Sequence, residues 1–349
     1  MHMADALLSP AVGGTMWAVS AGTIAYCSRK VRAGLDDHKI PLMGVLGAFI
    51  FAAQMINFTI PVTGSSGHLG GGLILAILLG PYAAFLTIAS VLMVQALFFA
   101  DGGLLALGCN IFNLGFFPAF IAYPCIYKRI IGSRPTMTRV SVAAVCAAVI
   151  GLQLGALGVV FETVSSGISS LPFATFVAIM QPIHLAIGIV EGLVTASVVS
   201  FIYKARPEIM QSAFESQPIG RPVRTLAISI FVMAMVSGGV VSWFASQKPD
   251  GLEWTIARVT GQKELKGPEQ GLHAALAAVQ GKLAFLPDYA FRKPAEAQKE
   301  VLLPEAALPP ADLAGRTVSG VIGGTVTLAL AFLIGVVLKR RRGFHGNDV

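Results

Sequence analysis

Charged residues are scarce in this sequence. Of its 349 residues only 12% are charged, whereas 55% are hydrophobic, and a soluble domain usually carries roughly 25% charged residues. Apolar runs of about 20 residues recur along the chain, which is the length that an α-helix needs to cross a bilayer. The sequence therefore predicts an all-α polytopic membrane protein with about nine transmembrane helices. Its net charge of +7 reflects basic loops between spans rather than a nucleic-acid surface.

Signatures of catalysis are also absent from the sequence. There is no GxxxxGK[ST] phosphate loop for ATP hydrolysis, no HExxH zinc-protease motif and no GxSxG motif of serine hydrolases. The four cysteines lack CxxC spacing and are expected to pack as small apolar residues. The chain is therefore not expected to be an enzyme. A membrane metalloenzyme with His184 and Glu191 at its centre stays open as an alternative.

Basic segments between the apolar runs predict the topology. No basic residue precedes the first run, so we expect no cleaved signal peptide and an amino terminus outside the cytoplasm. Arg29, Lys30 and Arg32 follow that run and mark a cytoplasmic loop, and the basic segment 339–342 places the carboxy terminus in the cytoplasm. The apolar stretch 69–79 is short. We interpret it as a span that turns at Gly80 and Pro81, with a broken or re-entrant helix as the alternative.

Composition divides the chain into two membrane parts. We expect a seven-span metal-binding part, a cytoplasmic linker, a two-span module with an external domain, and a cytoplasmic tail. Their predicted bounds are 1–205, 206–223, 224–342 (with the external domain at 246–316) and 343–349.

The first three residues, Met1-His2-Met3, predict a metal site. A histidine in second position offers the α-amine of Met1, the backbone nitrogen of His2 and its imidazole, which close two small chelate rings. His68, on the glycine-rich turn 64–69, is the best candidate for a fourth nitrogen. Four nitrogens in a square plane suit Ni(II) or Cu(II) better than Co(II). A histidine also occurs at position 2 by chance, so the terminus alone does not establish the site.

Further polar residues lie within or at the ends of the predicted spans. Six of them are expected to form a buried network that orients the metal ligands: Gln54, Asn57, Gln95, Asp101, Asn110 and Asn113. His184 and Glu191 are seven residues apart on one helical face. For these two, a structural hydrogen-bonded pair or a role at a protein contact is as good an interpretation as metal binding. His38, His273 and His345 are expected in solvent.

Several motifs together resemble the M component of energy-coupling-factor (ECF) nickel/cobalt importers. The resemblance covers residues 1 to about 205 and rests on MHMAD with Leu8-Ser9-Pro10, Gln54-Met55-Ile56-Asn57-Phe58, Ser66-Gly67-His68-Leu69, QALFFADGGLLALGCNIFN at 95–113, and HLAIG with Glu191-Gly192. Downstream, Pro249-Asp250-Gly251-Leu252-Glu253-Trp254 is similar to the signature of the two-span N component. The chain departs from the family at Met3-Ala4-Asp5-Ala6, where Ile-Pro-Asp-Gly is usual.

The resemblance implies a transport role in a plasma membrane of bacterial type. It implies that Met1, His2 and His68 hold the metal, that separate cytoplasmic ATPase subunits act through a transmembrane T subunit, and that the N part assists loading. We expect Ni(II) as the transported ion, because a deprotonated amide in a square-planar site favours low-spin Ni(II). Co(II) for cobalamin synthesis is the closest alternative. A metal sensor or a channel that needs no ATPase is a further one.

Overall fold

The computed structural model describes most of the chain. The residues outside the description are Met1, Leu35, Val62, Ser133, Arg134, Ser170, Ile209, Lys263, Glu264, Lys266, Glu269, 211–222, 293–309 and 344–349.

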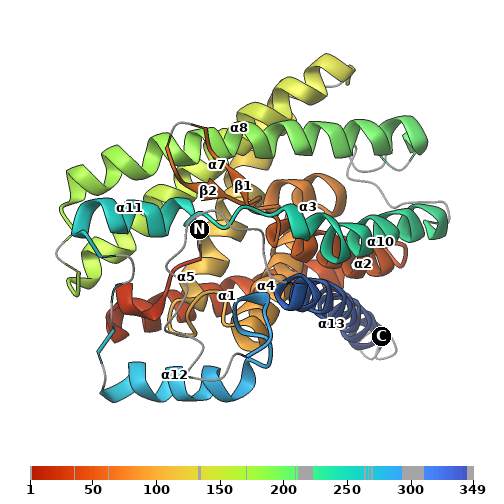
Figure 1. Ribbon diagram of the computed structural model, residues 1–349. Coiled ribbons are helices and arrows are strands. Elements are labelled where there is room, and N and C mark those ends of the chain that lie inside the picture. Colours follow the sequence, from red (N-terminus) through yellow and green to blue (C-terminus); the bar gives the residue numbers. More distant parts are fainter. Residues whose placement is uncertain are drawn as a thin grey trace.

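The described residues form helices and one short β-hairpin (Figure 1). In chain order the elements are η1 (Asp5–Leu7), α1 (Pro10–Gly34), α2 (Lys39–Gln54), β1 (Phe58–Thr59), β2 (Ser66–Gly67), α3 (Gly72–Leu79), α4 (Pro81–Phe99), α5 (Leu107–Ile111), η2 (Phe112–Tyr127), α6 (Lys128–Ile131), α7 (Met137–Ser166), α8 (Phe173–Ala205), α10 (Arg224–Gly239), η3 (Val241–Phe244), α11 (Gly251–Thr260), α12 (Gly271–Leu283), η4 (Pro287–Tyr289) and α13 (Pro310–Gly343).

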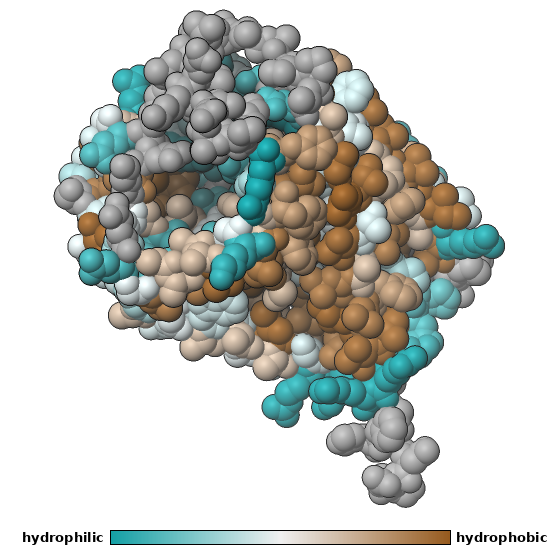
Figure 2. All heavy atoms as spheres, turned by 60° about the horizontal axis from the view of Figure 1, so that its bottom comes forward, coloured by the Kyte–Doolittle hydropathy of each residue, from teal (hydrophilic) through white to brown (hydrophobic). Residues whose placement is uncertain are grey.

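The helices confirm the prediction of an all-α polytopic membrane protein. Five are long and apolar enough to cross a membrane, and two further apolar helices, α2 and α10, are shorter. The five are Pro81–Phe99, Leu107–Ile131, Met137–Ser166, Phe173–Ala205 and Asp312–Arg341. Figure 2 shows a broad apolar surface with hydrophilic residues along its borders, as a bilayer-facing protein requires. The total of nine spans stays a prediction.

The predicted span over 69–79 is shorter than expected. Its helix, α3, has eight residues and so rises only about 12 Å, less than half of the hydrocarbon core. The backbone before it, from Ser65 to Gly71, is extended or irregular and buried. The alternative of a broken helix therefore describes this segment better. Irregular backbone at such depth is tolerated because protein covers it.

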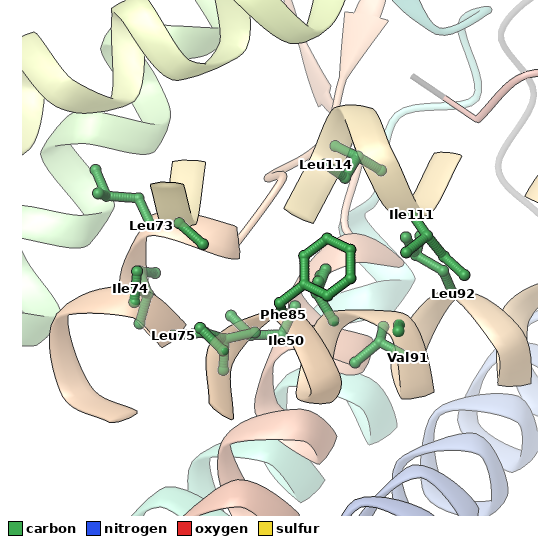
Figure 3. Packing of buried hydrophobic residues seen from close by; sticks show 14 of the residues in the cluster. Ile50, Leu73, Ile74, Leu75, Phe85, Val91, Leu92, Ile111 and Leu114 are labelled. Carbon is green, nitrogen blue, oxygen red and sulfur yellow. The ribbon is translucent and has the colours of Figure 1, made fainter. Parts of the chain in front are cut away.

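A central layer of α2, α3 and α4 is buried almost all round. Figure 3 shows aliphatic side chains from these helices and from the α5–η2 helix around Phe85. The α5–η2 helix is wound in π-type turns and contains Pro118 and Pro124, each of which lacks the N–H for a regular helical bond. The layer supports the loop that precedes α3.

The part of the chain after α8 packs onto the first part at several places. Helices α10 and α13 lie against α2 and against each other, and α11 lies along α8 (Figure 1). Where α10 meets α13, a methyl group on Gly238 would lie 3.0 Å from the Gly320 Cα. Small residues thus let these two helices approach closely, as is common in membranes.

Candidate metal site

The N-terminal segment is held by α5 and by the loop that precedes α5. The Met3 N–H donates to Asn110 Oδ1 at 2.8 Å, and the Met3 carbonyl accepts from Gly103 N at 2.9 Å. Two residues later, Asp5 Oδ1 accepts from Ala106 N at 2.9 Å. These bonds fix the position from which His2 projects. Met1, the predicted source of the amine ligand, lies outside the described residues.

The structure brings His2 and His68 together. Their rings stack with centroids 4.9 Å apart. His68 Nδ1 lies 3.0 Å from the Leu69 carbonyl, so Nδ1 carries the hydrogen and donates, and Nε2 of the neutral ring has the lone pair with which histidine binds a metal. His2 Nδ1 lies 3.3 Å from Asp101 Oδ1. Burial, the largest cause, lowers the pKa of both rings, and this favours the neutral imidazole that a metal needs.

The loop that carries His68 is fixed by two buried side chains. Gln54 Nε2 donates to the Gly70 carbonyl at 2.8 Å. The two carboxylate oxygens of Glu191 accept from the N–H groups of Gly70 and Gly71, at 2.8 and 3.0 Å. Glu191 therefore positions the His68 loop. Its bonds go to the backbone of this loop, whereas a pair with His184 was one sequence-based interpretation.

His184 lies at a contact between the two parts of the chain. Its Nδ1 donates to the Met180 carbonyl at 2.9 Å within α8. Across the contact, a methyl group on Gly251 would lie 3.3 Å from His184 Cε1 and 2.7 Å from Ile183 Cγ2. The glycine thus lets the start of α11 approach α8. Of the sequence-based interpretations, a role at a protein contact fits this geometry.

The other predicted network residues divide into those near the histidines and one that is elsewhere. Gln95 is fully buried, and its amide lies near the side chains of both His2 and Tyr289, although neither amide atom has a hydrogen bond of ordinary geometry among the described residues. Asn57 follows the end of α2. Its carbonyl accepts from Ser246 N at 2.7 Å.

Asn113 does not belong to this network. Its Nδ2 donates to Glu162 Oε2 of α7 at 2.7 Å, and it does not line the cavity beside the histidines. The expectation for His273 is also wrong. It is buried on α12, with Nε2 2.8 Å from the Leu8 carbonyl.

A cavity of about 350 Å³ opens beside the two histidines. Both parts of the chain line it: His2, Gln54, Met55, Asn57, His68 and Asp101 from the first part, and Ala245, Ser246, Gln247, Lys248, Pro249, Asp250, Glu253, Asp288, Tyr289 and Arg316 from the second. Sequence reasoning missed the second set as site residues. The sequence offered two signals there: the similarity of Pro249–Trp254 to the N-component signature, and the Asp250–Glu253 spacing, which is typical of a helix capping box.

Hydrogen bonds join the segment before α11 to the loop that carries His68. Ser66 N donates to the Pro249 carbonyl at 2.8 Å, and Ser66 Oγ donates to the Lys248 carbonyl at 2.7 Å. Asp250 caps α11, because its Oδ1 accepts from the N–H groups of Leu252 and Glu253, each at 2.8 Å. These bonds bring the Asp250 carboxylate to the cavity that contains His68.

Neighbouring groups interact with two carboxylates of the cavity, those of Asp101 and Asp250. Tyr289 OH donates to Asp101 Oδ2, so a residue of η4 contacts the carboxylate that faces His2. Burial would raise the pKa of Asp250, but nearby positive charge and its backbone N–H partners hold that pKa well below the usual range. Asp250 is therefore ionised at neutral pH.

Side chains alone do not make a complete metal site here. Among the described residues, no group of three or more His, Cys, Asp or Glu side chains is arranged to hold a metal ion. A metal bound by His2 and His68 therefore needs donors of another kind, such as backbone or terminal nitrogens, or water.

Comparisons with known proteins match both parts of the chain. Residues 2–209 match the family described as the cobalt uptake substrate-specific transmembrane region, and residues 224–340 match the PDGLE domain. A candidate fused nickel transport protein of Archaeoglobus fulgidus is 34% identical over 339 residues, which cover 96% of this chain and 98% of that protein.

Other relatives match over a shorter length. The fused nickel transport protein of Rhodobacter capsulatus is 30% identical over 60% of this chain and 64% of its own. The cobalt transport protein of Geobacter sulfurreducens is 26% identical over 78% of this chain and 81% of its own. Two solved structures of transition metal transporters are 30% identical, with TM-scores of 0.52 and 0.53. They cover 59% and 61% of this chain, and 99% and 97% of their own.

Proposed function

Because the chain belongs to the family of M components of ECF nickel/cobalt transporters, fused here to an N component, we propose that it captures Ni(II) for ATP-driven import. It is a membrane-integral transport component rather than an enzyme. The observation that supports the proposal most strongly is the stacking of His2 on His68 at a cavity.

The proposed ligands are four nitrogens. They are the α-amine of Met1, the backbone nitrogen and Nδ1 of His2, and Nε2 of His68. Nδ1 is the ring nitrogen that closes a six-membered chelate with the His2 amide, and it is the one near Asp101 at 3.3 Å. When Nδ1 binds the metal, the hydrogen of the neutral ring lies on Nε2, and the proton released comes from the His2 amide, with a second from the terminal amine where that amine is protonated.

The donor set favours Ni(II) over Co(II). A square plane of nitrogens that includes an anionic amide suits a d⁸ ion, whereas Co(II) gains less from that geometry. Cobalt is the second candidate, because the Geobacter relative is named as a cobalt transport protein. Buried neutral imidazoles serve either ion.

The orientation and the partners follow the same proposal. The cavity with His2 and His68 faces outside, and the basic end of α13 faces the cytoplasm. The sequence has no phosphate-binding loop, so ATP hydrolysis is assigned to separate ATPase subunits that act through a T subunit.

An uptake experiment tests the proposal. Cells that produce the chain with T and ATPase subunits receive radioactive Ni(II) and Co(II) in equal supply. We expect ATP-dependent accumulation with more nickel than cobalt, and loss of uptake in His2→Ala. His38→Ala is the matched control, because its ring lies 3.1 Å from Asp36 in the α1–α2 loop. Unchanged uptake in His2→Ala would overturn the ligand assignment, and uptake without the ATPase would favour a channel.

A further inference from the structure

A second cavity lies at the other end of α4 from the histidines. Pro81 begins α4 at this second cavity, whereas Asp101 follows the end of α4 at the first. The second cavity measures about 390 Å³, which is within the usual range for ligand sites of about 300–1,000 Å³. It is lined by the ends of α1 and α3, the starts of α2 and α4, and the helix of η2 and α6. We call it the basic pocket, because Lys30, Lys39 and Lys128 line it.

The lining of the basic pocket is positively charged. Apart from the three lysines, the described lining residues are aliphatic, tyrosine, glycine or proline, without a carboxylate. Asp36 and Asp37 lie nearby in the α1–α2 loop. Asp36 acts on Lys39 electrostatically and lies 3.1 Å from the His38 ring. Asp37 pairs with Lys339 at 2.7 Å. The lining therefore suits an anionic ligand.

Three different helices bring their lysines to the same pocket. Lys30 Nζ lies 5.7 Å from the centre of the Tyr26 ring, and Lys128 Nζ lies 5.4 Å from that of the Tyr123 ring. Such rings attract an ammonium group. Lys39 Nζ donates to the carbonyl of the last residue of α3 at 3.5 Å. Lysines at helix ends commonly extend to the membrane surface one by one, whereas these three converge on one cavity.

The start of α4 adds to the attraction for an anion. The first N–H groups of a helix have no partner within the helix, and the positive end of the helix dipole lies there. The residue before α4 is Gly80, and no side chain caps the helix. A methyl group on Gly80 would meet no atom within 4 Å, so there is room next to this turn. Together with the three lysines, the start of α4 suits a phosphate group.

The basic pocket lies at the depth of lipid headgroups. Helix α4 is a candidate membrane span, and its 19 residues rise about 28 Å, close to the hydrocarbon thickness of about 30 Å. Its first turn is therefore at a membrane surface. Gly34 and Pro124, which line the pocket, are exposed, so the pocket opens to the outside of the helix bundle. In the orientation proposed above, this surface faces the cytoplasmic leaflet, which contains anionic lipids.

We propose that the basic pocket binds one anionic phospholipid. Its phosphate lies among the three ammonium groups at the start of α4, and its acyl chains pass over the apolar lining toward the bilayer. A free phosphate ion would find the same charges but would gain nothing from the apolar lining. A lipid in this place contacts five helices of the folded protein and therefore stabilises the fold. The inference uses the membrane fold and its orientation, and it does not depend on the metal ligands.

Lipid binding by lysine variants tests the inference. The full-length protein in neutral detergent is titrated with phosphatidylglycerol and with phosphatidylcholine of the same acyl chains, and native mass spectrometry counts the bound lipids. We expect one tightly bound phosphatidylglycerol and weaker binding of phosphatidylcholine. Lys30→Gln and Lys128→Gln should each weaken phosphatidylglycerol binding about fivefold, as expected for one lysine beside an anionic lipid.

The neighbouring arginines provide matched controls. Arg29→Gln and Arg129→Gln remove the same charge one residue away, and neither arginine is among the described lining residues. At physiological salt they should weaken phosphatidylglycerol binding by less than about twofold, because salt screens charges outside the pocket. Equal losses in the lysine and arginine variants would show a diffuse attraction to the surface and overturn the inference. Equal affinity of the wild type for the two lipids would overturn it as well.

A blocked pocket gives a test that keeps every charge. Gly34→Trp places an indole at the pocket, and the new side chain has open space around its Cβ. This variant should lose the tightly bound phosphatidylglycerol. Gly22→Trp also has open space on α1, outside the described lining, and should bind as the wild type does. If the lysine variants do not fold, equal phosphatidylglycerol binding by the two tryptophan variants overturns the inference.

Two further measurements identify other occupants. Excess inorganic phosphate should leave phosphatidylglycerol bound, and its displacement would assign the pocket to a phosphate ion and contradict the lipid. If Lys30→Gln keeps phosphatidylglycerol but no longer binds the T subunit, the pocket is a protein contact and the inference is wrong. Ni(II) affinity in Lys30→Gln should equal that of the wild type, because the pocket and the histidines lie at opposite ends of α4. The lipid site and the metal site therefore fail separately.

Discussion

The two walls of the cavity beside the histidines are built differently. We call the lining residues from the first part of the chain the M wall and those from Ala245 onward the N wall. On the M wall, backbone and buried side chains fix the segments next to the proposed ligands: Asn110 holds Met3, and Gln54 and Glu191 hold the loop of His68. The N wall contributes none of the four proposed nitrogen ligands, and it is joined to the M wall by hydrogen bonds of Ser66, Ser246 and Tyr289. The difference predicts that mutations in the M wall change Ni(II) affinity more than mutations in the N wall do.

The largest expected effect comes from the M wall, in His68→Ala. This change removes one of four nitrogen ligands, and loss of an outer partner alone costs about 10–100-fold in affinity. We therefore expect the Ni(II) dissociation constant to rise by more than about 100-fold in equilibrium titration. His38→Ala should bind as the wild type does. Equal Ni(II) affinities of His68→Ala and His38→Ala would show that His68 is not a ligand.

Glu191→Gln should have the next largest effect. A glutamine offers one oxygen to the two N–H groups of Gly70 and Gly71, and its NH₂ group opposes the other. We expect a loss of about 10–100-fold in Ni(II) affinity, as for other residues that orient ligands. Glu208→Gln, beyond the end of α8 at an ion pair with Arg206, is the control. An unchanged affinity with an intact fold would show that the His68 loop does not need this carboxylate.

Lower pH should weaken binding. Protons compete for the ligand nitrogens, so acid favours the metal-free form. Burial lowers the pKa of His2 and His68 below 6.5, so above that pH the amide and the terminal amine carry most of the dependence. We expect affinity to rise about tenfold or more per pH unit between about pH 6.5 and 8, since at least one proton leaves. Calorimetry in buffers of different ionisation enthalpy counts the protons, and a count of zero contradicts the amide ligand.

The smallest effect on affinity is expected from Gly251→Ala, which disturbs the N wall. The new methyl group would lie 2.7 Å from Ile183 Cγ2, so α11 must shift away from α8. Hydrogen exchange at the Ser66 amide, which bonds to the Pro249 carbonyl, should become about tenfold faster, since local opening becomes easier. Ni(II) affinity should change far less than in His68→Ala, because Gly251 contributes none of the four proposed nitrogen ligands. Gly281→Ala has open space around it and is the control. A large loss of Ni(II) affinity in Gly251→Ala would show that the position of the N wall determines binding at the M wall.

The sequence predicted the M wall better than the N wall for a physical reason. The His2 chelate is a local pattern, and the turn with His68 follows from its glycines. Asp250 lies near the histidines only because residues far apart in the sequence, such as Ser66 and Pro249, pair in the fold. No local spacing in the sequence predicts such a pairing. Asn113 follows Asn110 by three residues, a spacing that puts two side chains on one face of a regular α-helix. The helix changes to π-type winding at Phe112, so the two side chains face different neighbours.

The chain start provides the most direct test of the central claim, that a terminal nitrogen chelate with His68 holds the ion. One residue added ahead of Met1, verified by mass spectrometry, displaces the amine and leaves every side chain unchanged. We expect this protein to lose tight Ni(II) binding in equilibrium titration. Wild-type affinity in the extended protein would contradict the central claim.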